Sequence, residues 1–420
     1  MKSIRDLSPG MLINVSLLAF LFLALLVPWK DLYRVFFFLG VMPGVLWSLK
    51  RYGLPAQFRS AAPCLLALLI IYLACNSFFV SAVGFSESLD QFRWGIEVLF
   101  LMGGVLIAGN VWIAQPRRYG LLFLSAVAFA GLSVLIPYLW EGKFSTRLAG
   151  YGFLSHPIQG ASTLLVLWTM GVSLLGLANA GRWLDRILVL ASAAIVIAVA
   201  VFSQSRGPVI AGILMLLLAV AARGISVPRL RLWSLLAVAG GLALVAGIGW
   251  WASETPDSWL YQVMTQRGFS YRPEIWSAIL ANCQGFWLWG EGTSTDFANT
   301  APGSVLKETM GYAFDHSHNL FLQTFLAGGM FALTLLLLAI GIMVFRLFRL
   351  YGVSRSPVAL TGLGVMLVTV MVNFTDTARL LSSPTPDWVL LWLPLFFVSL
   401  LTGRHGVSAD APATAEGRGL

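Results

Sequence analysis

The residues best suited to chemistry in this sequence lie together, where a polar segment meets a long apolar run. Positions 315–319 read Asp-His-Ser-His-Asn and hold two of the chain's four histidines, and the apolar run begins at Leu320. A histidine side chain exchanges protons near neutral pH, so it can serve as a general acid or base. The alternative is that both histidines are ordinary residues of a membrane–water boundary.

We expect a helix to begin within this pentapeptide, with the Asp315 side chain as its cap. On that helix His316 and His318 would point to nearly opposite sides, so they are not expected to share one metal ion. A histidine in the first turn also feels the positive end of the helix dipole, which disfavours its protonated form. A neutral imidazole is what a general base requires, and the free N–H groups of the same helix end favour a nearby phosphate.

Arginines on separate polar connections form a second group of candidates. Arg147 lies in a glycine-containing segment that bends at His156, immediately before Pro157. This segment is either a solvated turn whose arginine reaches the lipid headgroups or an anion-binding corner at the mouth of a cavity. The residues alone leave both interpretations open.

Arg206 lies in the turn Ser-Gln-Ser-Arg-Gly-Pro at 203–208, between two apolar runs. The run 208–222 would reach roughly 22 Å at ~1.5 Å per residue, which is short of the ~30 Å hydrocarbon core. We therefore expect the turn to lie below the outer surface of the membrane. Placing a lone arginine at that depth costs at least ~2.5–3.5 kcal/mol of free energy. Arg206 is therefore expected to bind an anionic ligand. The alternative is a buried ion pair with an acid of the bundle.

Further candidates lie in the polar segment 252–317, a length at which loops usually carry function. It contains Arg267 and then Arg272. Pro273 at a first helical position predicts a short amphipathic helix with Arg272 at its N-terminal edge. The glycine–tryptophan stretch 285–293 is typical of interface residues, and stacking on sugar rings is the rarer use of such tryptophans.

The elements that must position these residues are membrane helices. The 420 residues are 58% hydrophobic and 11% charged, with mean hydropathy +0.82, whereas a soluble domain carries about 25% charged residues. The sequence predicts an all-α integral membrane protein with about twelve transmembrane helices, in one membrane domain at 1–402 with a large outer loop that contains short helices. Residues 403–420 are expected to form a disordered cytoplasmic tail. The apolar runs are 11–27, 33–49, 63–80, 94–109, 120–140, 158–178, 184–202, 208–222, 233–251, 320–345, 358–374 and 388–401.

The charges orient the chain in the membrane. With the N-terminus cytoplasmic, most of the 27 lysines and arginines fall on inside segments and most of the 18 acids fall outside, as the positive-inside rule requires. The long loop therefore faces outward, and the net charge of +9 reflects membrane orientation and not nucleic-acid binding. The three cysteines form neither a disulfide framework nor a CxxC metal pattern.

These motifs, taken in order, resemble the bacterial O-antigen ligase family, part of a wider group with O-antigen polymerases and protein O-oligosaccharyltransferases. The resemblance rests on the outward Arg147, the Ser-Arg-Gly turn at 205–207, and the large outer loop followed by His-Ser-His-Asn. In the family the histidine is followed by a small polar residue and, further on, by Gly-x-x-Gly, and His318 and Gly329 fit that spacing. The chain departs from the pattern at Ala332, where the family has its second glycine.

The resemblance implies that a polysaccharide is moved from an undecaprenyl-pyrophosphate-linked glycan donor to a sugar of a lipid A–core acceptor. It places the site on the periplasmic face of the bacterial inner membrane, with both termini cytoplasmic. We expect no cofactor, and no metal because the outer face offers no Asp-x-Asp pair; membrane lipids are further partners, and the oligomeric state stays open. The expected catalytic residues are His318, as general base, and Arg206. The arginines expected to bind the donor pyrophosphate are Arg147, Arg206, Arg267 and Arg272, and the supporting residues are Asp315, His316, Asn319, His156 and Arg379.

Three rival functions are considered. A polymerase would use the same donor but a lipid-linked acceptor, so only the acceptor separates it from a ligase. A twelve-helix transporter is disfavoured because the two halves show no similarity and the ionisable residues gather at one face. A structural membrane protein would leave Arg206 unexplained.

Overall fold

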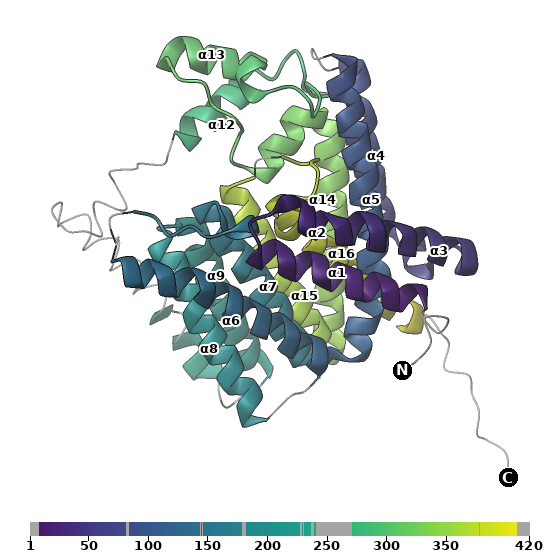
Figure 1. Cartoon of the computed structure of the whole chain (residues 1–420), viewed down its shortest axis with the longest axis vertical. Coiled ribbons are helices and arrows are strands. Elements are labelled where there is room, and N and C mark those ends of the chain that lie inside the picture. The colour runs from purple at the N-terminus through teal and green to yellow at the C-terminus, as the bar shows by residue number, and fades with distance from the viewer. Residues whose placement is uncertain are drawn as a thin grey trace.

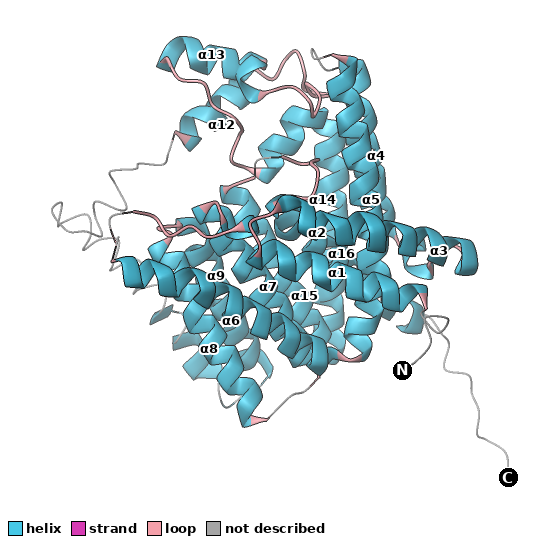
Figure 2. Ribbon diagram, in the orientation of Figure 1, coloured by secondary structure: helices cyan, strands magenta, loops and turns pink. Residues whose placement is uncertain are grey.

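The computed structural model describes residues 8–80, 84–142, 144, 146–178, 182–226, 229, 231–236, 239–240, 271–377 and 379–409. All regular secondary structure within these ranges is helical (Figure 2). The predicted all-α fold is therefore confirmed for the part of the chain that the structure describes.

Nine helical segments among the described residues are long and apolar enough to cross a membrane, so the chain is a multi-pass membrane protein. They are α1 (Pro9–Leu26), the continuous segment of α2 (Lys30–Phe36), η2 (Phe37–Val41) and α3 (Met42–Tyr52), α4 (Ala61–Val80), α5 (Phe85–Ala114), α6 (Pro116–Glu141), α7 (Pro157–Leu177), α8 (Trp183–Phe202), α14 (Leu320–Ser354) and α15 (Pro357–Thr375). Two further apolar helices are α9 (Arg206–Ser226) and the pair η7 (Trp388–Trp392) and α16 (Leu393–Ala409).

The predicted count of about twelve helices stays a prediction. The expected run 233–251 lies largely outside the described residues. At the other end, α16 continues past Gly403 to Ala409, into the region expected to be a disordered tail. Residues 410–420 lie outside the described part of the chain.

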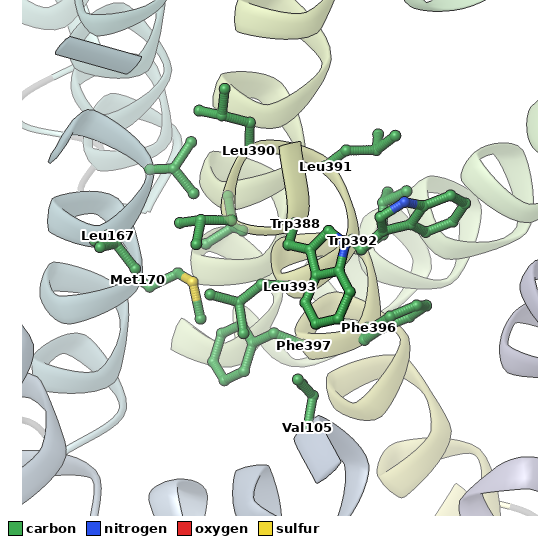
Figure 3. Packing of buried hydrophobic residues seen from close by; sticks show 14 of the residues in the cluster. Val105, Leu167, Met170, Trp388, Leu390, Leu391, Trp392, Leu393, Phe396 and Phe397 are labelled. Carbon is green, nitrogen blue, oxygen red and sulfur yellow. The ribbon is translucent and has the colours of Figure 1, made fainter. Parts of the chain in front are cut away.

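The middle of the bundle is filled by a helix that has no polar face. Residues 388–401 are almost all apolar and all buried, and a helix that is apolar on every side is stable only where other elements surround it. Figure 3 shows Trp388 and Trp392 of this helix among side chains of its neighbours, including Val105 of α5 and Met170 of α7. η7 and α16 therefore form the packed centre of the molecule.

This centre also anchors the connection that follows α15. The indole N–H groups of Trp388 and Trp392 donate to the carbonyl oxygens of Ser382 and Leu380, at 2.9 and 2.8 Å. Buried indoles ordinarily need such a partner. The polar connection 376–387 is thereby fixed against the most rigid part of the bundle.

A smaller layer lies on one side of the bundle, which we call the outer side. It contains α12 (Arg272–Ala281), η6 (Phe297–Asn299) and α13 (Ala301–Met310), and in Figure 1 α12 and α13 lie beyond the start of α14. The predicted short helix is confirmed: α12 has proline in its first turn and buries Ile275 and Ile279, whereas the apolar Leu280 of the same helix is exposed. The two isoleucines share a small apolar core with Phe325 and Leu326 of α14. Two short helical turns complete the fold, η3 (Ala56–Arg59) and η4 (Gly152–Leu154).

α14 is broken where the outer layer meets the bundle. Gly328 and Gly329 have non-helical backbone angles, and the φ of 64° and ψ of −163° at Gly329 are accessible to glycine and not to other residues. The segment 287–292 fills the break, and the N–H of Glu291 donates to the carbonyl of Leu326 at 2.7 Å. Backbone groups freed by the break are thus bonded to a loop.

Helix α4 fixes this junction from the side. The side-chain amide of Asn76 donates to the carbonyl oxygens of Trp289 and Ala327, at 2.8 and 3.1 Å. The hydroxyl of Tyr72 donates to the carbonyl of Gly328 at 3.0 Å. Buried carbonyl groups are costly when unpaired, so these bonds hold the outer layer in one position on the bundle.

Candidate active site

The histidine segment 315–319 does not form the first turn of α14, which corrects the expectation from sequence. α14 begins at Leu320, and Asn319, not Asp315, caps it by accepting from two backbone N–H groups at 2.9 and 3.1 Å. Asp and Asn cap helices equally well, and the one adjacent to the apolar run is used. His318 precedes the cap with φ of 54°, so the expected effect of the helix dipole on a first-turn histidine does not apply to it.

The left-handed conformation of His318 brings the two histidine rings together. Their centroids lie 3.9 Å apart, so the expectation that they point to opposite sides was wrong, because the segment is not helical. Nδ1 of His318 lies 2.9 Å from Oδ1 of Asp376, and Nε2 of His316 lies 3.7 Å from the same oxygen. Both imidazoles therefore face one carboxylate.

Neighbouring elements hold the histidine segment in place through Ser317. The indole of Trp276, on α12, donates to the Ser317 carbonyl at 3.0 Å. The side chain of Gln323, on α14, accepts from the Ser317 N–H at 3.2 Å. A residue between the two histidines is thus tied both to the outer layer and to the bundle, which pre-organises the imidazoles.

Asp376 is positioned by the end of α15. It is the residue after that helix and is 7% exposed. Next to it, the Thr377 hydroxyl donates to the carbonyl of Asn373 at 2.7 Å, and the Asn373 amide donates to the carbonyl of Leu390 at 2.8 Å. The carboxylate therefore projects from a backbone that the central helix fixes.

The surroundings set the charges of this pair. Burial lowers the pKa of His318, and its hydrogen bond to Asp376 opposes this only in part. Burial alone would raise the pKa of Asp376, but the nearby imidazole of His316 and the hydrogen bond with His318 hold it below its usual range. An ionised carboxylate thus meets a neutral imidazole. Because a carboxylate only accepts hydrogen bonds, Nδ1 of His318 carries the proton and Nε2 is left to accept one.

Arg272 supplies a positive charge to the same place. It is the first residue of α12, and burial lowers its pKa while the charge of Asp376 acts against that change. A guanidinium remains protonated nonetheless. Among the described residues, neither Nε of Arg272 nor Oδ2 of Asp376 has a hydrogen-bond partner. Buried polar atoms without partners are uncommon in native proteins and mark places where a ligand can bind.

Arg147 is bound to the turn that carries Arg206. Its Nε donates to the carbonyl of Ser203 at 2.8 Å, and its Nη2 lies 3.4 Å from Oγ of Ser205. The backbone N–H of Leu148 also donates to the carbonyl of Phe202 at 3.0 Å. Two sequence-predicted arginines on separate connections are therefore brought to one corner.

The same corner packs against the end of α15. α9 begins at Arg206, and the next residue, Gly207, packs so closely on Thr375 that an added Cβ would clash with its side chain. Thr375 immediately precedes Asp376. Contacts thus run from Arg147 through the Arg206 turn to the residue before the carboxylate that binds His318.

The apolar part of the helix after Arg206 is short, as the sequence predicts. α9 has 21 residues in all, but its apolar part ends at Ala221, and that part is shorter than the nine segments that could cross a membrane. The depth of Arg206 in the membrane stays a prediction.

The remaining predicted residues are placed as follows. His156 caps α7, its ring Nδ1 accepting from the Gln159 N–H at 3.5 Å, and burial lowers its pKa while the charge of Asp376 raises it. Asp315 and Arg379 are exposed and line the cavities beside His316. Arg267 lies outside the described residues, so its role stays a prediction.

Two acids of the connection after α15 were missed from sequence, where only Arg379 was singled out. Asp376 is one. The other is Asp387, which is 7% exposed and lies 3.4 Å from the Thr385 hydroxyl. Burial and then the charge of Asp376 raise the pKa of Asp387 to about 7. An acid directly after an apolar run, inside a Ser/Thr-rich connection, is a signal that could have been used.

The three central groups could also hold a metal ion. The nearest ligand atoms of His316, His318 and Asp376 all lie within 4.8 Å of one another. His316 and His318 can therefore face one metal ion although they are two residues apart, because the segment is not helical. The expectation of metal-independent chemistry stays a prediction and needs a direct test.

Comparisons with known proteins agree with the resemblance. Residues 191–337 match the family model described as O-antigen ligase. The chain is also 26% identical over 401 residues to an O-antigen ligase of Pseudomonas aeruginosa, and this alignment covers 91% of the chain and 90% of that relative. The segment matched by the family model contains Arg206, Arg272 and the histidine segment. The resemblance to O-antigen ligases is therefore confirmed.

Proposed function

We propose that this protein is an O-antigen ligase. It transfers a polysaccharide from undecaprenyl pyrophosphate to a sugar hydroxyl of lipid A–core, at the periplasmic face of the inner membrane. One observation carries the proposal: His318 and the buried Asp376 form a pair with a bond of 2.9 Å, close to the positive charge of Arg272 and to the corner where Arg147 meets the Arg206 turn. This set contains a base for a hydroxyl and cations for a diphosphate.

The base is His318. Asp376 accepts the Nδ1–H of the imidazole, which fixes both the ring orientation and the tautomer, as in other carboxylate–histidine pairs. Nε2 then accepts the proton of the acceptor hydroxyl while its oxygen attacks the anomeric carbon. The low pKa of His318 keeps the ring neutral at the start of the reaction.

The arginines act on the leaving group. As the bond between the anomeric carbon and the phosphate oxygen breaks, its electron pair moves to the pyrophosphate. Arg206, Arg147 and Arg272 hold that group, because the guanidinium fork suits phosphate oxygens. Their charge stabilises the negative charge that grows in the transition state. One displacement of this kind inverts the anomeric configuration.

Ligase activity is preferred over polymerase and transporter activity for different reasons. The family model and the relative are both described as O-antigen ligases, which favours lipid A–core over a lipid-linked acceptor. A transporter would not require a neutral imidazole held by a carboxylate beside several guanidinium groups.

The proposal is tested by replacing each histidine in turn. In purified protein supplied with lipid-linked glycan and lipid A–core, His318→Ala should lower the transfer rate by ~10²–10⁴-fold, the usual contribution of a general base. His316→Ala should lower the rate less, and His405→Ala, which changes the histidine near the end of α16, should leave it unchanged. If His316→Ala abolishes transfer and His318→Ala does not, the base is His316 and the assignment is wrong.

A further inference from the structure

Beside His316 lies a polar cavity that the proposed mechanism does not use. It consists of two adjoining spaces of about 200 and 530 Å³ that share Asp296, Phe297, Asp315 and Arg379 among their lining residues. The larger space reaches His316 and the smaller one reaches the first turns of α5. Figure 1 shows the outer layer, with α13, at the same end of the molecule as the upper end of α4, with loops between them. These volumes suit a small ligand, since ligand pockets run from roughly 300 to 1,000 Å³.

Two side chains of α5 line the smaller space with buried atoms that have no partner. Gln91 is 7% exposed, and its Oε1 accepts no hydrogen bond from any described residue. Nε1 of Trp94, one helical turn further, is likewise buried and unpartnered. Positions three apart lie on the same helix face. An unpaired acceptor and an unpaired donor, side by side, match a ligand that carries hydroxyl groups, which both donate and accept.

The charge of the cavity excludes a phosphate. Glu87, Asp90, Asp296 and Asp315 line it, and Arg379 is the opposing cation among the described lining residues. Asp90 is also paired with Arg93 on the exposed side of α5, at 3.1 Å. Excess negative charge repels a pyrophosphate but accepts hydrogen bonds from sugar hydroxyls. The arginine corner and this cavity therefore select different chemical groups.

We infer that this cavity binds the acceptor saccharide, the sugar of lipid A–core whose hydroxyl attacks the donor. Gln91 and Trp94 bond its hydroxyls, and the acids at the rim orient the ring. This inference rests on the proposed function. It gives the site two sides: the arginines hold the diphosphate, the acidic cavity holds the acceptor sugar, and the two imidazoles with Asp376 lie between them.

The first experiment separates the Michaelis constants of the two substrates. Gln91→Leu removes the unpaired oxygen with little change of size. We expect the KM for lipid A–core to rise about tenfold, the effect of losing one hydrogen bond, while the KM for the lipid-linked donor stays unchanged. Gln57→Leu, which changes a half-buried glutamine of η3 outside the cavity, is the matched control and should leave both constants unchanged.

The second experiment measures binding without catalysis. Protein in nanodiscs is titrated with core oligosaccharide from which lipid A has been removed, and binding is followed by thermophoresis. Trp94→Phe should weaken binding several-fold, whereas Trp140→Phe, at an exposed tryptophan near the end of α6, should not. Because the oligosaccharide lacks phosphoundecaprenyl and acyl chains, a change in its affinity reports on the saccharide site alone.

The outcomes separate this inference from the proposed function. Absence of transfer by the unmodified protein contradicts the function itself. Normal transfer, with the acceptor KM of Gln91→Leu unchanged, contradicts the saccharide site alone. A rise in the donor KM instead would assign the cavity to the donor's glycan and overturn the acceptor assignment.

Discussion

Asp376 determines how His318 can act as a base. Without a carboxylate on Nδ1, a neutral imidazole has two tautomers, and only the one with a free Nε2 lone pair can take a proton on that side. The 2.9 Å contact selects that tautomer. Asp376 touches the imidazole and not the sugar, so it is a positioning residue.

Asp376→Asn should therefore change both the rate and its pH dependence. Without the carboxylate, burial lowers the pKa of His318 unopposed, so the acid side of the pH–rate profile should move to lower pH. The rate at its maximum should fall by ~10²-fold or more because the tautomer is no longer fixed. Initial rates of transfer measured between about pH 5 and 8 give both quantities. A rate loss without any displacement of the acid limb would show that Asp376 serves structure only.

The metal alternative is tested at the same residues. A metal held by His316, His318 and Asp376 would make transfer sensitive to chelators, since its ligands must be deprotonated and the ion can exchange. The proposed base mechanism predicts an unchanged rate after prolonged dialysis against EDTA. Loss of activity that is restored by one divalent metal would replace the base mechanism by a metal-assisted one.

Arg206 is expected to need its guanidinium and not merely its charge. Arg206→Lys keeps a cation but loses the planar fork, so transfer should fall by ~10²-fold, as when one transition-state donor is removed. Arg118→Lys, at an exposed arginine near the start of α6, is the matched control and should have no effect. Full activity of Arg206→Lys would mean that this residue contributes only a screening charge.

Among the helices, α14 matters most for how the outer layer is joined to the bundle, because it is broken at Gly328 and Gly329. Gly329 lies against the backbone of Leu288, so that a side chain there would collide with main-chain atoms, and its φ is positive. The same loop is bonded to α4 through Asn76. The break therefore joins the outer layer, with Arg272 and Trp276 on α12, to the bundle that carries Asp376.

Gly329→Ala should destabilise this junction by at least ~1–3 kcal/mol, the usual cost of a non-glycine residue in such a conformation. Gly341→Ala, elsewhere in the same helix, is the matched control, because an added methyl group there meets no neighbouring atom. Thermal unfolding of the purified proteins, followed by tryptophan fluorescence, should show a lower midpoint for Gly329→Ala alone. Equal midpoints would mean that the loop is not held at the break.

Local features of the elements were readable from sequence, and long-range contacts were not. Pro273 and the apolar residues after it predicted α12, because helix starts and amphipathic faces are local. The cap of α14 was misassigned because Asp315 and Asn319 have the same capping chemistry. The partner of His318 follows another helix, α15, at a distance in sequence that no spacing rule covers. The two histidine rings meet because His318 has a positive φ, which its residue type did not predict.

At the scale of the whole molecule, charge is separated across one site. The arginines come from the connection before α7 and from the first residues of α9 and α12, and the acids come from α5 and the segments 293–297 and 315–316. Only 11% of the residues are charged, so each charged position could be assigned to one side of the membrane. The sequence therefore predicted one polar face with several arginines. It did not predict the acidic side, because single acids on separate connections have no common pattern until the helices are packed.

The most direct measurement is a defined reconstitution. Purified protein in liposomes, without an ion gradient and in the presence of EDTA, is supplied with undecaprenyl-pyrophosphate-linked glycan and, separately, with lipid A–core or a second lipid-linked glycan. The account predicts glycan attached to lipid A–core by the unmodified protein, at a rate ~10²–10⁴-fold lower with His318→Ala, and no elongation of the lipid-linked glycan. Elongated lipid-linked glycan with no product on lipid A–core would contradict it.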